Sequence, residues 1–376
     1  MFRKIVYVVL GVWLLTACGA TGPTATAPTA EQATEVQPPA EMTATTGQTG
    51  EATPTVASAA ATQPTTGAAS QSTETREIIM AMPYIPNVQF AHFYVADKKG
   101  YYADAGIKVT FDYNFETDVV QRVAQNTVQF GMASGDSVLL ARGQGLPVVT
   151  VATNSQKFPT VLFSKATENI TRPADLKGKS VGIPGRFGAS YIGLLALLYA
   201  NNMTENDLNV QEIGFTQAQA VQQDKVQVGV GYGNNEPIQL EQQGIQTNVI
   251  RVSDFFPLAS DGLITSETLI KEQPDVVRAF VQATLKGMQD VINNPDEGFN
   301  IALEYIPEAQ RGDTQLQRKV LQDTITYWQN DVTSKNGLGY TDDNNWQATY
   351  KFLRDSSLLK TDVDVSTAYT NEFIMK

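Results

Sequence analysis

The chain has a single cysteine, Cys18, in 376 residues. This count excludes an internal disulfide, a thiolate zinc cluster and a cysteine-ligated iron–sulfur site. A folded domain must therefore be held together by a large apolar core, and about 300 residues are available to build it. Because one core seldom organises that many residues, we expect two lobes.

The first residues have the pattern of a secretory signal. Arg3 and Lys4 precede the apolar run 5–15, which is too short for an ordinary membrane span, and small residues lead into Cys18. The pattern resembles the lipobox of bacterial lipoproteins, in which the cysteine is lipidated (palmitate being one acyl chain) and becomes the mature N-terminus. We therefore expect a signal peptide over 1–17 and a lipid anchor on the extracytoplasmic face of the cell membrane. The alternative is a secreted protein with a chance cysteine.

The next segment differs in composition from the rest of the chain. Residues 19–75 are mostly Thr, Ala, Pro, Gln, Gly and Ser, with no Lys, Arg or aromatic residue. Such a segment buries too little apolar surface to offset its ordering entropy. We therefore predict that 18–76 is a disordered tether, the alternative being a targeting remnant without a mechanical role.

Charge and histidine content exclude several other functions. The formal net charge of −12 favours solubility and argues against nucleic acid as a partner. His92 is the only histidine, so a multi-histidine metal site is excluded and a Ser-His-Asp triad would have to include it. We interpret His92 as a helix-face residue near the rim of a pocket. No complete phosphate-binding loop is present, and 185–188 lacks the G-x-G-x-x-G spacing, so this segment indicates a pocket-lining turn before a helix.

Strand and helix patterns alternate along the first part of the globular region. This alternation predicts a parallel sheet with right-handed crossovers. The expected strands are 78–82, 107–113, 130–133 and 147–152, and the expected helices are 88–99, 118–125 and 137–142.

The pattern starts again after Phe163 and becomes helical after Pro274. We therefore predict an α/β fold with a first lobe over 77–163, a second lobe over 164–262, and a return over 263–376 whose helices pack on the first lobe. The expected elements are strands 180–183, 210–213, 226–230 and 249–252, and helices 191–200, 274–292, 295–305, 313–328 and 343–354.

Ligands of open α/β sheets bind at the carboxyl ends of strands. The loops predicted there are rich in amides, hydroxyls and aromatic rings and poor in cations, whereas a phosphate or sulfonate site would need several Arg or Lys residues. They suit a flat, largely uncharged heterocycle, although the asparagines could be ordinary turn formers. The candidate ligand contacts are Tyr84, Asn87, Asn114, Ser134, Gln156, Phe187, Tyr232, Asn235 and Glu236.

Several motifs resemble those of one family. Residues 84–91 and 99–107, the segment 141–149 (R-x-x-G-x-P-V-V) and the segment 174–182 (A-D-L-K-G-K-x-V-G) are similar to the thiamine-pyrimidine/nitrate/sulfonate-type solute-binding proteins of ABC importers. The resemblance covers about 77–376. It implies a two-lobed periplasmic-binding-protein-like fold (type II), with two crossing strands, that closes over its ligand.

The opening 83–90 looks most like the riboflavin-binding lipoproteins of Chloroflexus-type bacteria. This resemblance implies riboflavin as a transported ligand, no cofactor and no catalysis, and a monomer that delivers its ligand to an ABC permease. Aromatic faces would hold the isoalloxazine ring, and amides would hold its edge and the ribityl hydroxyls.

Other functions remain open at this point. A binder of hydroxymethylpyrimidine or formylaminopyrimidine is the alternative within the class. A thiamine-pyrimidine-synthesising enzyme of the same superfamily would carry a cysteine-rich motif tied to iron, which this chain lacks. A surface adhesion or scaffold domain would bind no small molecule. We also expect rim acids, namely Asp118, Asp136 and Asp261, either to pair with permease arginines or to be solvated.

Overall fold

The computed structural model describes residues 75–375. The predicted signal peptide, Cys18 and nearly all of the predicted tether lie outside these residues. No helix within 75–375 is both long enough and apolar enough to cross a membrane.

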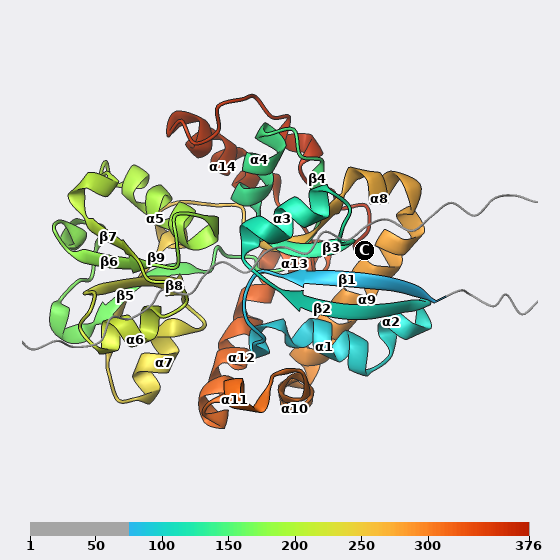
Figure 1. Cartoon of the computed structure of the whole chain (residues 1–376), viewed down its shortest axis with the longest axis horizontal. Coiled ribbons are helices and arrows are strands. Elements are labelled where there is room, and N and C mark those ends of the chain that lie inside the picture. The colour runs from blue at the N-terminus through green and yellow to red at the C-terminus, as the bar shows by residue number, and fades with distance from the viewer. Residues whose placement is uncertain (1–74, 376) are drawn as a thin grey trace, which may run out of the picture. The chain divides into compact units, whose positions relative to one another are not determined.

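The strands of the described region form two five-stranded sheets (Figure 1). The first has the order β2-β1-β3-β10-β4 and the second the order β7-β6-β8-β5-β9. We call each sheet with its covering helices a lobe. The strands are β1 (Arg76–Met82), β2 (Ile107–Tyr113), β3 (Phe130–Ser134), β4 (Val148–Thr153), β5 (Thr160–Lys165), β6 (Ser180–Ile183), β7 (Asn209–Glu212), β8 (Val228–Tyr232), β9 (Thr247–Arg251) and β10 (Asp261–Ser266).

One strand in each lobe, absent from the predicted set, departs from the expected parallel arrangement. β1 runs parallel to β2 and β3, and β6 runs parallel to β7 and β8. However, β5 is antiparallel to β8 and β9, and β10 is antiparallel to β3 and β4. These are the two strands that follow the crossings between the lobes, so each enters its sheet from the opposite end.

The crossings lie in short segments of chain. Thr153 ends β4 in the first sheet and Thr160 begins β5 in the second, so the chain reaches the second sheet before residue 164. The return lies between the end of β9 at Arg251 and the start of β10 at Asp261.

The helices up to residue 254 mostly begin where a strand of their own lobe ends. The predicted helix 88–99 is a 3-10 turn followed by an α-helix. These elements are η1 (Val88–Phe90), α1 (Ala91–Lys98), α2 (Tyr101–Asp104), α3 (Glu116–Ala124), α4 (Gly135–Gly143), η2 (Ala166–Glu168), η3 (Pro173–Leu176), α5 (Gly188–Ala200), η4 (Glu205–Asp207), α6 (Gln217–Gln222), α7 (Glu236–Gln242) and η5 (Val252–Asp254).

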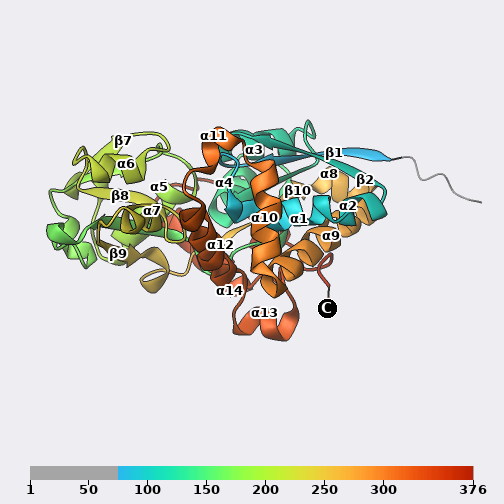
Figure 2. The same cartoon turned by 90° about the horizontal axis from the view of Figure 1, so that it is seen from below.

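The C-terminal helices pack back on the first lobe, as the sequence predicts. α9 packs on α1 and α2, α10 packs on α1, and α14 packs on α4, whereas α12 contacts both η1 and α7 (Figure 2). The elements are α8 (Glu267–Glu272), α9 (Pro274–Asn293), α10 (Pro295–Tyr305), α11 (Glu308–Arg311), α12 (Thr314–Trp328), α13 (Asp331–Asn336), α14 (Asp343–Asp355) and η6 (Val365–Thr367).

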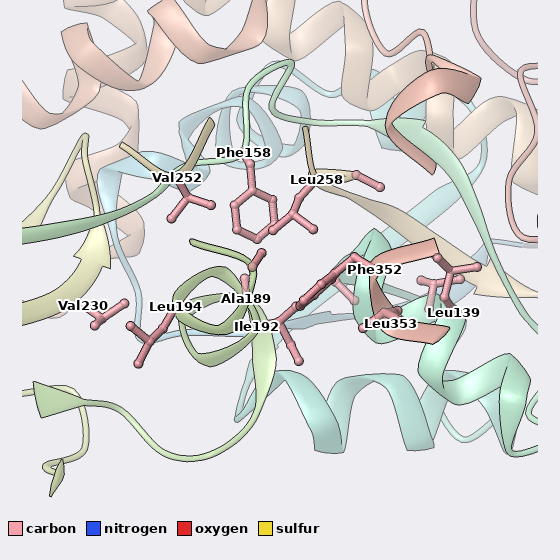
Figure 3. Close-up of a cluster of buried hydrophobic side chains, with 14 of the residues drawn as sticks. Leu139, Phe158, Ala189, Ile192, Leu194, Val230, Val252, Leu258, Phe352 and Leu353 are labelled. Carbon is pink, nitrogen blue, oxygen red and sulfur yellow. The ribbon is translucent and has the colours of Figure 1, made fainter. Parts of the chain in front are cut away.

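One apolar cluster joins the two lobes near the crossings (Figure 3). It brings Phe158 and Leu258 of the crossing segments together with Ile192 of α5 and with Leu139 and Phe352 of the first lobe. All five side chains are buried. Because packed interiors tolerate little displacement, this cluster fixes where the first turn of α5 lies relative to the crossings.

His92 lies in the core of the first lobe instead of at a pocket rim. It is buried in α1, and its ring centroid is 4.9 Å from that of buried Trp328. Neither imidazole nitrogen has a hydrogen-bond partner among the described residues. Burial lowers the pKa of His92 to about 3, because the surroundings disfavour the charged form.

Candidate functional site

A cavity lies where loops of both lobes meet. It encloses about 960 Å³ of empty space, part of which is open to solvent. Its walls carry six aromatic rings, polar groups and three carboxylates, and no Lys, Arg or His lines it within the described chain. The rings are those of Tyr84, Phe90, Phe115, Phe187, Phe215 and Tyr232.

Four of these rings form a chain of contacts across the cavity. Phe115 of the first lobe stacks on Phe215 of the second, with centroids 5.2 Å apart and an interplanar angle of 27°. Phe115 also meets Phe187 edge-on at 5.3 Å, and Tyr84 meets Phe215 edge-on at 4.8 Å. These residues follow the carboxyl ends of β1, β2, β6 and β7. Such rings offer faces and edges on which a flat heterocycle can stack.

Glu116, the first residue of α3, links the two lobes. Its Oε1 accepts hydrogen bonds from the Ser134 amide at 2.7 Å and from Ser134 Oγ at 2.6 Å, both within the first lobe. Its Oε2 accepts one from the Ala189 amide of α5 at 3.2 Å, in the second lobe. The carboxylate therefore serves as the cap of α5, whose own N-cap residue, Phe187, makes no side-chain capping bond.

Glu236 and Asp261 add carboxyl groups to the cavity wall. Glu236 Oε2 accepts a hydrogen bond from the Tyr232 amide at 2.7 Å, and burial raises the pKa of Glu236 to about 7. Asp261 Oδ2 accepts one from Asn154 Nδ2 at 2.8 Å, and burial raises the pKa of Asp261 above its usual range. The Tyr232 hydroxyl has its pKa raised far above 10, first by burial and then by the negative charge of nearby acids.

Two amide oxygens on the cavity wall have no partner among residues 75–375. Asn234 donates through Nδ2 to Gln89 Oε1 at 3.0 Å and to Thr324 Oγ1 at 2.8 Å, but its Oδ1 is buried and unpaired. Asn154 Oδ1 is likewise buried and unpaired. A buried acceptor without a donor is unfavourable by about 1–3 kcal/mol. Both asparagines line the cavity together with the three carboxylates.

Six of the nine predicted contact residues line the cavity, namely Tyr84, Ser134, Phe187, Tyr232, Asn235 and Glu236. Burial, followed by the charge of Glu236, raises the pKa of the Tyr84 hydroxyl above its usual range. Asn235 is buried, and its Oδ1 accepts a hydrogen bond from Gln239 Nε2 at 3.0 Å.

The other three predicted residues lie outside the cavity lining. Asn87 caps η1, with Oδ1 accepting from the Gln89 amide at 3.0 Å. Asn114 Oδ1 accepts from the Phe115 amide at 2.8 Å. Gln156 is buried and donates from Nε2 to the Tyr340 carbonyl at 3.1 Å. The two asparagine side chains thus serve the local backbone, which was the alternative for the asparagines, whereas Gln156 bonds to a carbonyl 184 positions away in the chain. Ligand contact by these three stays a prediction.

Two of the three expected rim acids are buried. Asp136 is 0% exposed and Asp261 is 7% exposed, so neither can reach a partner protein in this conformation. Burial, followed by the charge of Glu116, raises the pKa of Asp136 to about 8. Asp118 is half-buried on α3, where it pairs with Arg122 at 3.4 Å. The expectation of a rim position is wrong for Asp136 and Asp261, because sequence proximity to a strand end does not distinguish an exposed rim from the buried interior.

The predictions also missed residues on the cavity wall. Phe215, three residues after β7, follows a strand in the way that marked the other loops. Asp261 lies in β10, a strand that was not predicted. Thr324 lies within α12, where no local signal distinguishes it from other helical residues. No cluster of three or more His, Cys, Asp or Glu side chains within 75–375 could hold a metal ion.

Comparison with known proteins places the chain in a family. Residues 87–298 match the family model described as NMT1/THI5 like. The chain is 48% identical over 377 aligned residues to riboflavin-binding protein RibY of Chloroflexus aurantiacus, covering 99% of this chain and 97% of RibY. The chain belongs to the NMT1/THI5-like family.

The chain is also similar to proteins that are named for other functions. The chain is also 24% identical to the 4-amino-5-hydroxymethyl-2-methylpyrimidine phosphate synthase of Legionella pneumophila, over 81% of this chain and 94% of the synthase. Among solved structures, the alkanesulfonate-binding protein SsuA of Xanthomonas axonopodis, bound to MOPS, matches with a TM-score of 0.62 and 12% identity, over 78% of this chain and 98% of SsuA. The predicted two-lobed α/β fold of periplasmic binding proteins is confirmed.

Proposed function

We propose that this protein captures riboflavin outside the membrane, without altering it, and delivers it to an ABC permease. The observation that carries this proposal is the cavity between the lobes, where aromatic rings and hydrogen-bond acceptors gather without a cation. The similarity to RibY over nearly the whole chain supports the same ligand.

The composition of the wall fits the parts of riboflavin. The isoalloxazine system is flat and uncharged, so it can stack on the faces that the ring cluster of Tyr84, Phe115 and Phe215 turns toward the cavity. Its imide N–H and the four ribityl hydroxyls are donors, which suits the unpaired amide oxygens of Asn154 and Asn234 and the carboxylates of Glu236 and Asp261. A ligand that carries several donors would remove the cost of those buried acceptors.

Binding would also act on the relation between the lobes. Ligand contacts to residues of both lobes favour the closed arrangement over an open one. The free energy of closure changes by the difference between the binding free energies of the ligand for the two states. The closed form then presents one defined surface to the permease. In this proposal no bond in the ligand is made or broken, so the protein is a carrier and not an enzyme.

The test is a titration of the full-length chain with riboflavin, followed by quenching of flavin fluorescence and by calorimetry. We expect saturable binding of one riboflavin per chain and unchanged riboflavin on release. Lumiflavin, which keeps the ring but lacks the ribityl hydroxyls, should bind at least tenfold more weakly. Binding of hydroxymethylpyrimidine in place of riboflavin would favour the alternative ligand class, and chemical conversion of either compound would contradict a carrier role.

We further propose that Cys18 carries the lipid anchor on the extracytoplasmic face and that the following segment is the tether. The support is the basic start, the apolar run 5–15 and the position of the cysteine. Labelled palmitate should enter the wild-type protein, which should sediment with membranes, and Cys18→Ala should abolish both. Retention of the label in Cys18→Ala would contradict the proposed anchor.

A further inference from the structure

Glu116 holds a position in the cavity at which an anionic ligand could otherwise bind. The start of α5 faces the cavity, and Gly188, Ala189 and Ser190 of its first turn line the wall. The first amides of a helix are unpaired donors at the positive end of the helix dipole, so they attract anions. Here the Ala189 amide donates to Glu116 Oε2 at 3.2 Å.

The environment of Glu116 shows that this contact is built into the fold. The residue is 9% exposed, and Ser134 fixes the other carboxylate oxygen with two short hydrogen bonds. Gly188 gives the carboxylate room, because a Cβ there would lie 2.8 Å from Glu116 Oε2. Glu116 of the first lobe thus supplies the negative charge that the first turn of α5 in the second lobe attracts.

We propose that Glu116 determines the charge of the ligand that this site accepts, by occupying the start of α5 and excluding an anion from it. This inference rests on the proposed function. It predicts that the site binds riboflavin more tightly than riboflavin 5′-phosphate. The phosphate would be repelled by the Glu116 carboxylate, and no cation on the described wall offsets that repulsion.

The fold by itself does not impose this choice. A structure of the same fold, the alkanesulfonate-binding protein SsuA, is bound to the sulfonate MOPS. Charge selection must therefore come from side chains. Glu116 is the cavity carboxylate that bonds directly to the helix start, whereas Glu236 bonds to the Tyr232 amide and Asp261 to Asn154.

The experiment compares dissociation constants for riboflavin and riboflavin 5′-phosphate in wild type and variants of the full-length chain. Wild type should prefer riboflavin at least 100-fold, and Glu116→Gln should reduce that preference at least tenfold, mainly by tighter binding of the phosphate. Glu116→Asp keeps the charge in the cavity and should retain the preference. Glu77→Gln makes the same change of net charge on an exposed residue of β1 and serves as the control.

Glu116→Ser removes the same charge with a smaller side chain, and it replaces Glu116→Gln if circular dichroism shows that the glutamine variant is unfolded. A preference that changes less than twofold in the folded variant overturns the inference and leaves the proposed function standing. If the wild-type protein does not bind riboflavin, the proposed function is overturned. Inorganic phosphate is then the probe, since it should raise the melting temperature of Glu116→Gln and leave wild type and Glu77→Gln unchanged. No such rise would overturn the role of Glu116 as well.

Discussion

The Glu116 carboxylate lies so close to Gly188 that there is no room for a side chain at position 188. A Cβ on Gly188 would lie 2.8 Å from Glu116 Oε2, and Gly188 has a φ of +65°. The residue is therefore constrained twice, by its backbone conformation and by the carboxylate of the other lobe.

Replacing Gly188 by alanine should separate these two constraints when compared with Gly214→Ala. Gly214 has a φ of +61° and nothing within 4 Å of a Cβ, so its alanine variant should lose only about 1 kcal/mol of unfolding free energy. Gly188→Ala should lose at least twice as much. Urea unfolding measures both variants. The double variant Gly188→Ala/Glu116→Ala should recover the excess, and equal losses at the two glycines would contradict the contact.

Phe215 should contribute to riboflavin affinity although it was not among the predicted contacts. It joins the rings of Phe115 and Tyr84, so Phe215→Ala removes a stacking surface and should weaken binding by about 1–3 kcal/mol. Fluorescence titration measures the change. Phe255, which is 42% exposed and outside the cavity lining, provides the control, and its alanine variant should bind as wild type does. An unchanged affinity in Phe215→Ala would exclude the ring from the binding surface.

Asn87→Ala should destabilise the fold by about 1 kcal/mol without altering ligand affinity more than twofold. The side chain caps η1 through the Gln89 amide and lies outside the cavity lining. Asn87→Ser keeps an acceptor at the cap and should restore most of the unfolding free energy. If Asn87→Ser restored stability but still bound riboflavin tenfold more weakly, the predicted ligand contact would be correct instead.

His92 should make the fold less stable in acid. Its pKa falls from 6.5 to about 3 on folding, so the unfolded chain binds the extra proton and stability is lost as the pH falls through that window. The loss is about 1.4 kcal/mol per pH unit at most. His92→Leu keeps an apolar side chain and should flatten the change between pH 6.5 and 4. Identical pH slopes for the two proteins would show that His92 does not titrate on unfolding.

Asp136 should make the fold less stable as the pH rises, which is the opposite of the effect of His92. Its pKa rises from 3.8 to about 8 on folding, so the folded chain holds the proton and stability falls as the pH rises through that window. Asp136→Asn should remove this loss, and its advantage over wild type should grow from pH 5 to pH 8. Chemical unfolding at three pH values measures it. A constant difference between variant and wild type would mean that Asp136 does not carry the proton.

The sequence located most elements of the fold because local patterns mark them. The run 107–113 alternates in polarity and forms β2 over the same residues, and the helix starting at Pro295 ends at Tyr305 as predicted. Both follow from periodicity and from residues that begin or end an element. β5 and β10 were not among the predicted strands, and their antiparallel direction depends on the path of the chain between the lobes and not on their own residues.

For the site, the sequence determined which kinds of residue follow the strands, and six of nine predicted contacts line the cavity for that reason. Only the tertiary structure decided which side chains face the ligand space, since Asn87 turns to its own backbone and Thr324 reaches the wall from a distant helix. It alone placed Glu116 on the Ala189 amide, because a hydrogen bond between residues 73 positions apart depends on how the lobes meet. Local propensity is a property of neighbours in the chain, whereas burial and charge at the site are set by neighbours in space.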